Sequence, residues 1–368
     1  MKRLFVVITG LMAVTLVVSA CAADTAEDWP QRPIEVTVGW SAGGSSDLIS
    51  RTIAREMEEE LGVTMQITNV EGATGGIGAG QVARAPADGY RVFAGASVHG
   101  MWPVMDLADV GWEDFYAFLA GFTPTTIYVA DDSPYQTIED LVAAMEEDPG
   151  SLRFGTPGPG SNGEILVRVL FDVAGLPENA AEHVPYGGGS EAGQFLAAGE
   201  VDFISVTLAD VIDLARDGQI RPLGNLFPEE MELAGLTFPS IIDSYPELEP
   251  YTAINPWFGM YLSRETDPEI VERFTEAFLA AVEDESFRQW FEEEFFSVHQ
   301  PTVGQEADEV MSQIESARGW ALYDLGMAPN NPAEMGIPQI TKWSWPPHER
   351  AEQAEPWPEG VQAAASGG

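Results

Sequence analysis

The chain is poor in basic residues. It has 17 lysines and arginines against 59 aspartates and glutamates, so its formal net charge at pH 7 is −42. Such a charge opposes binding to nucleic acid or anionic lipid, and neither is expected as a partner. The acids are spread over several predicted helices rather than gathered in one tail. We therefore predict an acidic surface adapted to salt, as in a saline or alkaline habitat.

Cysteine and long apolar runs are also scarce. Cys21 is the only cysteine, and no apolar run after the N-terminus is long enough to span a membrane. Residues 1–21 combine Lys2 and Arg3, an apolar stretch and the sequence Val-Ser-Ala-Cys, which is typical of a lipoprotein signal peptide. We expect Cys21 to be lipidated, residues 22–28 to be a tether, and the mature protein to be periplasmic or on the cell surface. An ordinary signal peptide with a chance cysteine is the alternative.

Catalytic motifs are few. The four histidines lack metal-ligand spacing, and no glycine loop is followed by a Walker lysine. The sequence around Ser97 and His99 misses the spacing of a hydrolase nucleophile turn by one residue. Residues 158–163 match the dinucleotide fingerprint, but two prolines interrupt that loop. We therefore expect no metal, no cofactor and no enzyme activity.

Strand and helix patterns alternate along the rest of the chain, which predicts an α/β fold with mainly parallel sheets between helices. Strands are predicted at residues 35–39, 63–70, 91–96, 122–130, 152–154, 183–186, 201–206, 220–226 and 252–262. The later helices are predicted at residues 138–147, 164–173, 191–198, 208–216, 268–282, 287–296 and 307–325. Residues 341–368 are predicted to form a tail without a hydrophobic core of its own.

The most informative stretch is the glycine loop at residues 40–47, which joins a strand to a helix. Gly43 and Gly44 permit backbone angles that other residues avoid. The three residues that follow, Ser45, Ser46 and Asp47, are helix N-cap candidates. A bare helix N-terminus behind such a loop is a ready anion site. A plain strand-to-helix turn is the alternative.

Similar loops follow other strands, at residues 95–97, 155–163 and 186–190. In open α/β sheets, ligands bind at the carboxyl ends of strands, so loops in both halves suggest two lobes facing one cleft. The hydrogen bonds from one loop would barely offset the free-energy cost of binding a ligand, whereas hydrogen bonds from loops in both lobes would offset it. This favours a small organic carboxylate held by backbone N–H groups rather than by arginine.

Short motifs appear in a fixed order between about residues 29 and 326. They include Trp29-Pro30, Trp40-Ser41-Ala42-Gly43-Gly44, Asp88-Gly89-Tyr90, Phe154-Gly155-Thr156, His183-Val184-Pro185-Tyr186 and Trp257-Phe258-Gly259. Together they resemble the solute receptors of tripartite tricarboxylate transporters, the Bug family. The resemblance implies a two-lobed periplasmic-binding-protein type II fold with crossover strands near residues 122–130 and 252–262. Lobe 1 would comprise residues 29–121 and 255–340, lobe 2 residues 122–254, and residues 341–368 have no counterpart.

The resemblance also implies that loops 40–47 and 155–162 close on a ligand carboxylate through backbone N–H groups and ordered water. The ligand-binding residues it implies are Ser41, Ala42, Gly43, Gly44, Ser46, Asp47, Ser97, Thr156, Gly158, Ser161, Asn162, Tyr186, Gly187 and Asp202. Ser45 departs from the family, which usually has glycine there, and this leaves the ligand open. Asp47 is either a helix cap or a selector for ligands that carry a donor group.

The function that follows is that of a monomeric solute-binding lipoprotein. It would capture a di- or tricarboxylate and deliver it to the membrane permease of a tripartite transporter. A sensor that presents its ligand to a two-component signalling kinase is the alternative.

Overall fold

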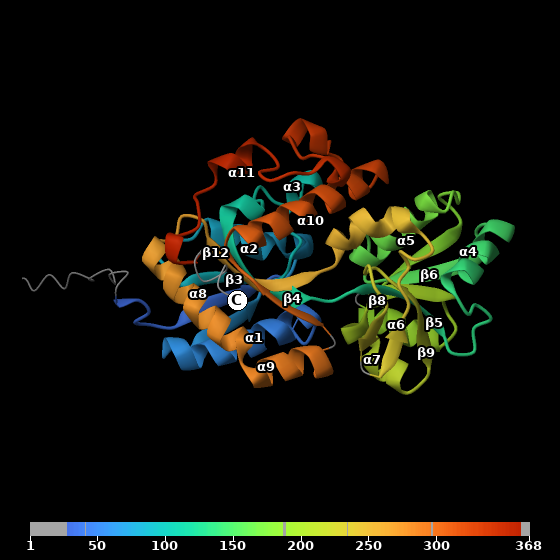
Figure 1. The fold of residues 1–368 in the computed structure, drawn as a ribbon, viewed down its shortest axis with the longest axis horizontal. Coiled ribbons are helices and arrows are strands. Elements are labelled where there is room, and N and C mark those ends of the chain that lie inside the picture. Colours follow the sequence, from blue (N-terminus) through green and yellow to red (C-terminus); the bar gives the residue numbers. More distant parts are fainter. Residues whose placement is uncertain (1–27, 41, 187–188, 234, 296, 362–368) are drawn as a thin grey trace, which may run out of the picture.

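The computed structural model describes residues 28–40, 42–186, 189–233, 235–295 and 297–361. Two lobes lie side by side, each built on one β-sheet (Figure 1). The sheet of lobe 1 has the order β13-β4-β12-β3-β1-β2, and that of lobe 2 the order β7-β6-β8-β5-β9. The strands of lobe 1 are β1 Ile34–Val38, β2 Met65–Asn69, β3 Arg91–Ala96, β4 Phe115–Phe122, β12 Trp257–Ser263 and β13 Val298–Thr302. Those of lobe 2 are β5 Thr125–Ala130, β6 Leu152–Thr156, β7 Ala181–Pro185, β8 Phe203–Thr207 and β9 Ile220–Asn225, with a hairpin of β10 Met231–Leu233 and β11 Leu236–Phe238.

The sheets are mixed, whereas we expected mainly parallel ones. β1 is parallel to β2 and β3, and β6 is parallel to β7 and β8. The strands next to the lobe crossings, β12 and β5, are antiparallel to both of their neighbours. A strand that enters directly from the other lobe arrives without a crossover helix, so nothing imposes the parallel direction on it.

Helices cover both faces of each sheet. In lobe 1, α1 and α8 lie on one side of the sheet and α2 and α10 on the other (Figure 1). The helices of lobe 1 are α1 Ser45–Leu61, α2 Gly76–Ala83, α3 Met101–Val104, α8 Pro268–Glu283, α9 Glu285–Gln289 with a π-helical turn at Trp290–Glu294, and α10 Gly304–Asp324. Those of lobe 2 are α4 Ile138–Glu147, α5 Asn162–Val173, α6 Gly189–Ala197 and α7 Leu208–Arg216. Among the described residues, no helix combines the length and the apolar character needed to cross a membrane.

Both crossings between the lobes differ from the expected continuous strands. β4 ends at Phe122 and β5 begins at Thr125, so residues 123–124 break the strand predicted at 122–130. On the return, a 3₁₀ helix at Pro246–Ile254 precedes β12. The two crossings lie side by side, because Asn255 Oδ1 accepts from the Thr125 N–H at 2.9 Å and the Thr123 N–H donates to the Pro256 carbonyl at 3.1 Å. The sequence analysis did not predict β4. All of its residues are buried, so its sequence lacks the alternation of polar and apolar residues that marks a half-exposed strand.

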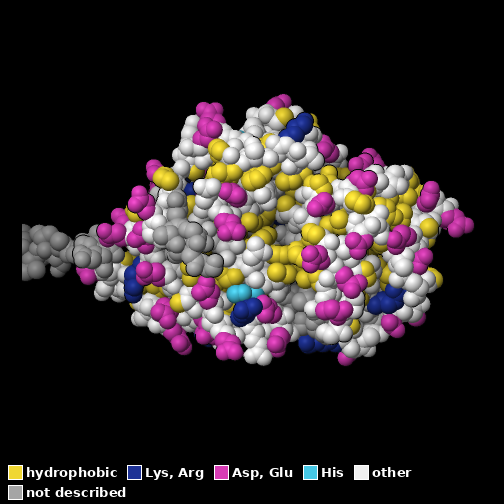
Figure 2. Space-filling view, in the orientation of Figure 1, with side chains coloured by type: hydrophobic (Ala, Val, Ile, Leu, Met, Phe, Trp, Pro, Cys, Tyr) yellow, Lys and Arg dark blue, Asp and Glu magenta, His cyan; other side chains and the backbone are white. Residues whose placement is uncertain are grey.

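The surface is as acidic as the composition predicts. Figure 2 shows acidic side chains spread over the visible face of both lobes, with few basic ones among them. On the same face, hydrophobic side chains gather where the two lobes meet (Figure 2). Adaptation to salt remains a prediction.

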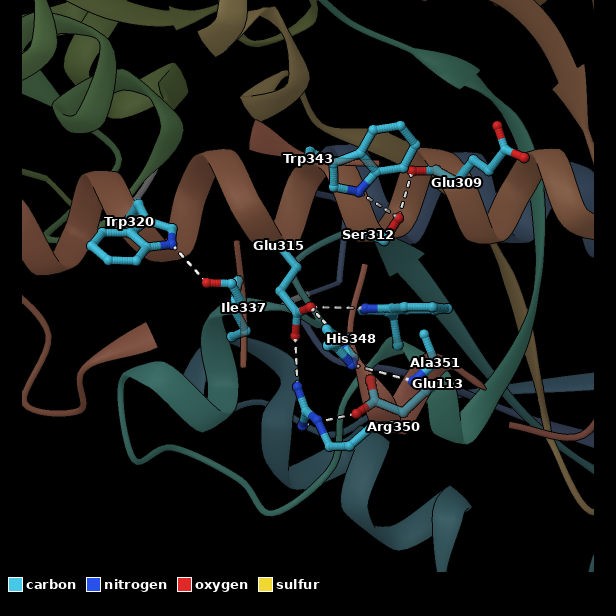
Figure 3. Close-up of polar contacts among 11 residues, drawn as sticks. Glu113, Glu309, Ser312, Glu315, Trp320, Ile337, Trp343, His348, Arg350 and Ala351 are labelled. Carbon is cyan, nitrogen blue, oxygen red and sulfur yellow. Dashed lines mark hydrogen bonds and ion pairs between the residues drawn. The ribbon is translucent and has the colours of Figure 1, made fainter. Parts of the chain in front are cut away.

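The C-terminal segment packs on lobe 1. We expected residues 341–368 to lack a core of their own, and the described part shares the core of lobe 1 instead. Trp357 and Val361 are buried, and the Trp357 ring meets the ring of Tyr116 edge-on at 4.8 Å. His348 and Arg350 reach Glu315 on α10, and Arg350 also pairs with Glu113 at 2.8 Å (Figure 3). We call residues 340–361 the C-terminal strap; it contains a 3₁₀ turn at Ile340–Lys342 and α11 Glu349–Gln353.

Candidate functional site

The first glycine loop, residues 40–47, joins β1 to α1 at the carboxyl end of a lobe 1 strand. Three of its residues are exposed: Ala42, Gly43 and Gly44. Gly44 is the N-cap of α1, and no side chain caps this end, so the serines expected as caps do not serve that role. The loop therefore presents bare backbone and a long helix's N-terminus to solvent, which is the arrangement of an anion site.

Asp47 holds the shape of this loop. Its Oδ2 accepts hydrogen bonds from the Gly43 N–H and from Arg51 Nε, both at 2.9 Å, and its Oδ1 accepts one from Asn69 Nδ2 at 2.8 Å. Burial alone would raise the pKa of Asp47, but these hydrogen bonds outweigh it and hold the pKa below its ordinary value. Because both oxygens are engaged within the protein, the structure favours a loop-fixing role for Asp47 over a selector role.

The Trp40 ring fixes the loop over the end of the sheet. It packs against Gly95 of β3 and Gly75, and a Cβ at Gly95 would overlap the ring. Gly95 also has a φ of +129°, which residues with a side chain rarely adopt. Asn69 Nδ2 donates to the Trp40 carbonyl at 2.9 Å, so the loop is tied to the neighbouring strand β2 as well.

The second glycine loop, residues 155–162, joins β6 to α5 in lobe 2. Ser161 is the N-cap of α5, and its hydroxyl accepts from the Glu164 N–H at 3.3 Å. Gly158 has a φ of +121°. Like the first loop, this one ends at the N-terminus of a helix.

A hydrogen-bonded chain of three side chains, largely shielded from solvent, fixes the second loop. Glu164 accepts from the Gly160 N–H at 2.9 Å and contacts His183 Nδ1 at 3.0 Å, and His183 Nε2 lies 2.7 Å from Thr156 Oγ1. The connectivity is that of a hydrolytic triad. However, Thr156 is 0% exposed, and its hydroxyl donates to the Gly158 carbonyl at 3.2 Å, so in this structure it is engaged within its own loop. We interpret the chain as a support for the loop.

Each glycine loop contacts the opposite lobe through one of its own residues, Ser45 in the first loop and Asn162 in the second. Ser45 Oγ donates to Asp210 Oδ1 of α7 at 3.3 Å. Burial raises the pKa of Asp210, although hydrogen bonds from Thr207 and Ser45 oppose this rise. In the second loop, Asn162 Oδ1 accepts a hydrogen bond from Arg318 Nη2 of α10 at 2.5 Å. Both glycine loops are therefore in contact with the opposite lobe in this structure.

Two more predicted site residues lie next to these loops. Ser97 is buried, and its Oγ accepts from the Trp257 N–H at 3.1 Å, so it joins β3 to the crossover strand β12. Tyr186 borders the second loop, where its N–H donates to the Thr156 carbonyl at 2.9 Å and its ring stacks on Phe195.

Asp202, expected to be a ligand-binding residue, lies away from the two glycine loops. It precedes β8, and its Oδ2 accepts from the Arg153 N–H at 2.7 Å near the amino end of β6. Thr156 and the second loop lie at the opposite end of β6, so Asp202 links strands and is withdrawn from the site. Ser41, Gly187 and Cys21 lie outside the described residues.

The sequence reasoning missed several residues at the loops: Asn69, Glu164, Asp210 and Arg318. Asp210 had a usable signal, because it lies in the first turn of a helix that directly follows a strand. Arg318 had no such signal in the sequence, because it lies in the interior of a long helix.

Two cavities lie where the lobes adjoin. One of about 490 Å³ lies between α5, α10 and Tyr251, and one of about 220 Å³ lies at the crossings near Asn255 and Trp257. Of the described residues, neither 40–47 nor 155–162 lines them. Within the described part of the chain, no three histidine, cysteine or acidic residues are placed to hold a metal ion.

Comparison with known proteins agrees with this geometry. Residues 49–320 match the model of the tripartite tricarboxylate transporter family receptor. A UPF0065 protein from the gbd 5′ region of Cupriavidus necator is 28% identical over 299 residues, which cover 78% of this chain and 87% of that protein. Protein BugT of Bordetella pertussis is 27% identical, covering 74% of this chain and 82% of its own, so the Bug resemblance is confirmed.

The two-lobed α/β fold is confirmed as well. The structure of Rpa4515 from R. palustris with adipate has a TM-score of 0.70 at 25% identity, covering 82% of this chain and 99% of that one. Its fold agrees with the two helix-flanked sheets described above. The chain therefore belongs to the tripartite tricarboxylate transporter receptor family, whose members are periplasmic solute-binding receptors and not enzymes.

Proposed function

We propose that this receptor binds a small organic di- or tricarboxylate between its lobes and delivers it to the permease of a tripartite transporter. The observation that carries the proposal is the pair of glycine loops, each ending at a helix N-terminus and each in contact with the opposite lobe. The similar structure with adipate supports the ligand class.

The energetics require both loops. Micromolar affinity needs about 8 kcal/mol. A hydrogen bond to a charged group contributes about 1.5–3 kcal/mol, and a helix terminus adds about 0.3–1 kcal/mol.

Gly160 also faces Met101, Met105 and Leu322 of lobe 1, so apolar side chains lie close to the second loop. Methylene groups between two carboxylates would suit such surroundings, which favours an aliphatic dicarboxylate.

A thermal-shift screen of mono-, di- and tricarboxylates in high salt tests the ligand. A ligand at 100 times its dissociation constant adds about 2.7 kcal/mol of stability, which corresponds to a shift of several degrees. High salt matters because the acidic surface would otherwise repel an anion. A shift with sugars or nucleotides but with no carboxylate would contradict the proposal.

The variant Gly44→Val tests the first loop. Gly44 has a φ of −81°, which valine adopts without strain, so the variant is expected to fold. Its side chain would cover the bare helix N-terminus, and we expect carboxylate binding to fall at least tenfold by calorimetry. Unchanged affinity in a variant of unchanged melting temperature would show that the loop is only a turn.

We also propose that lipidated Cys21 anchors the mature monomer to a membrane. The lipobox sequence supports this. Cys21→Ala is expected to move the protein from the membrane fraction to the soluble fraction, and equal membrane retention would contradict the anchor.

A further inference from the structure

Arg318 is a buried cation without an anionic partner. Its side chain is 1% exposed in the middle of α10, and among the described residues no carboxylate forms an ion pair with it. Burial lowers the pKa of Arg318 to about 10. Leaving a buried charge unpaired is costly, and here it happens in a chain whose acids outnumber its bases 59 to 17.

Arg264 shows what a satisfied buried arginine looks like in this protein. Its Nη1 and Nη2 donate to the two Asp308 oxygens at 2.9 and 2.7 Å, and its Nε donates to the Glu355 carbonyl. The Nε of Arg318, by contrast, has no acceptor within the described residues, and Nη1 has only the Met101 sulfur at 4.0 Å. Donor capacity therefore remains on one side of the Arg318 guanidinium.

The guanidinium lies where the two lobes meet. Its Nη2 donates to Asn162 Oδ1 of the second glycine loop and, at 2.9 Å, to the Ile254 carbonyl beside the chain crossing. Met101, its sulfur contact, belongs to lobe 1 and also faces Gly160 of the second loop. Opening of the lobes would carry Asn162 away and leave the guanidinium facing the cleft.

We propose that Arg318 is a ligand-binding residue, whose guanidinium binds a carboxylate of the captured solute. The carboxylate would accept from the donors that the protein leaves unused and would supply the missing countercharge. This proposal differs from our expectation that backbone N–H groups and ordered water, rather than arginine, hold the ligand. It rests on the proposed carboxylate function and deepens it, because the unpaired cation would select anions over neutral solutes.

The competing interpretation is that Arg318 only links the lobes through Asn162. Calorimetric titration with adipate separates the two, using the wild type, Arg318→Met, Arg318→Lys and the control Arg273→Met. Arg273 is exposed on α8, so its replacement makes the same change in net charge away from the lobe junction. We expect adipate affinity to fall about 10- to 100-fold in Arg318→Met, less in Arg318→Lys, and to be unchanged in Arg273→Met.

The outcomes distinguish the two proposals. A wild type that binds adipate, with Arg318→Met binding it equally well, overturns the role of Arg318 and leaves the carboxylate function intact. A wild type that binds neither adipate nor any other carboxylate of the screen overturns both. If the wild type does not bind adipate but binds another carboxylate, the same titrations with that carboxylate test the role of Arg318.

A measurement on the wild type covers the case in which Arg318→Met does not fold. The ¹⁵N resonance of the Arg318 Nε–H, assigned by its absence in Arg318→Lys, is followed during titration with the binding carboxylate. A change in this resonance that saturates with the ligand, with the Arg273 resonance unmoved, supports the proposal. A resonance that does not move at saturation overturns it.

Discussion

Asp47 and Asp88 are two aspartates that each pair with an arginine, in very different surroundings. The Asp47 side chain is 3% exposed and has three donors, whereas Asp88 pairs with Arg32 at 3.0 Å with 46% of its side chain exposed. Sequence reasoning singled out Asp47 but left its role open, because whether a carboxylate is satisfied depends on residues distant in sequence, such as Asn69.

We predict that Asp47→Asn destabilises the protein by about 1–3 kcal/mol at pH 7, and Asp88→Asn by less than about 1 kcal/mol. The folded-state pKa of Asp47 is depressed, so its contribution is present above the ordinary pKa of 3.8 and is lost as pH falls through the folded value. Denaturant unfolding from pH 7 to pH 3 is the measurement. Equal effects of the two variants would contradict the role given to Asp47.

Glu113 should make the stability of the protein depend on pH with the sign opposite to that of Asp47. Burial and then the charge of Glu315 raise its pKa to about 7, although Arg350 opposes them. Between pH 4.5 and 7 the folded protein retains a proton that the unfolded chain releases, so this group's contribution to stability falls as pH rises. We predict that the difference in unfolding free energy between wild type and Glu113→Gln falls by on the order of 2 kcal/mol across this window.

The control for Glu113 is Glu276→Gln, which changes an exposed glutamate on α8. It should leave the pH dependence of unfolding as in the wild type. A Glu113→Gln curve parallel to the wild type would contradict the raised pKa.

Among the elements, the C-terminal strap joins distant parts of lobe 1. Trp357 Nε1 donates to Asp308 on α10 at 2.9 Å, and the Trp357 ring packs on Phe118 of β4 as well as on Tyr116. Its sequence, rich in proline and tryptophan, has no periodic pattern, so its packing could not be predicted. The loops after β1 and β6, in contrast, were predictable, because glycine and capping residues act on their own neighbours.

We predict that Trp357→Ala lowers stability by about 3–5 kcal/mol, because it empties a buried site. Trp343→Ala is the matched control. Trp343 is half-buried and its Nε1 donates to Ser312 at 3.2 Å, so its replacement should cost clearly less. Thermal unfolding of both variants is the measurement, and an equal or smaller loss for Trp357→Ala would show that the strap adds little to lobe 1.

For the whole molecule, the net charge of −42 governs how stability responds to salt. Like charges spread over both lobes repel one another, and salt screens this repulsion (Figure 2). We predict that the melting temperature at pH 7 rises by several degrees between about 0.1 and 2 M sodium chloride. The rise should shrink at pH 4, where many carboxylates are protonated, and a flat or falling salt dependence at pH 7 would contradict salt adaptation.

The sequence by itself determined the α/β class, the acidic surface, the family and the glycine loops. These features depend on composition, on short-range periodicity or on residues adjacent in the chain. Only the tertiary structure decided that the sheets are mixed, that Asp202 lies at the wrong end of β6 and that the strap joins lobe 1. It also placed Arg318 beside Asn162, 156 residues away in sequence, without an acid to pair with it among the described residues. Burial and charge pairing are set by which segments meet in space, and no local pattern records that.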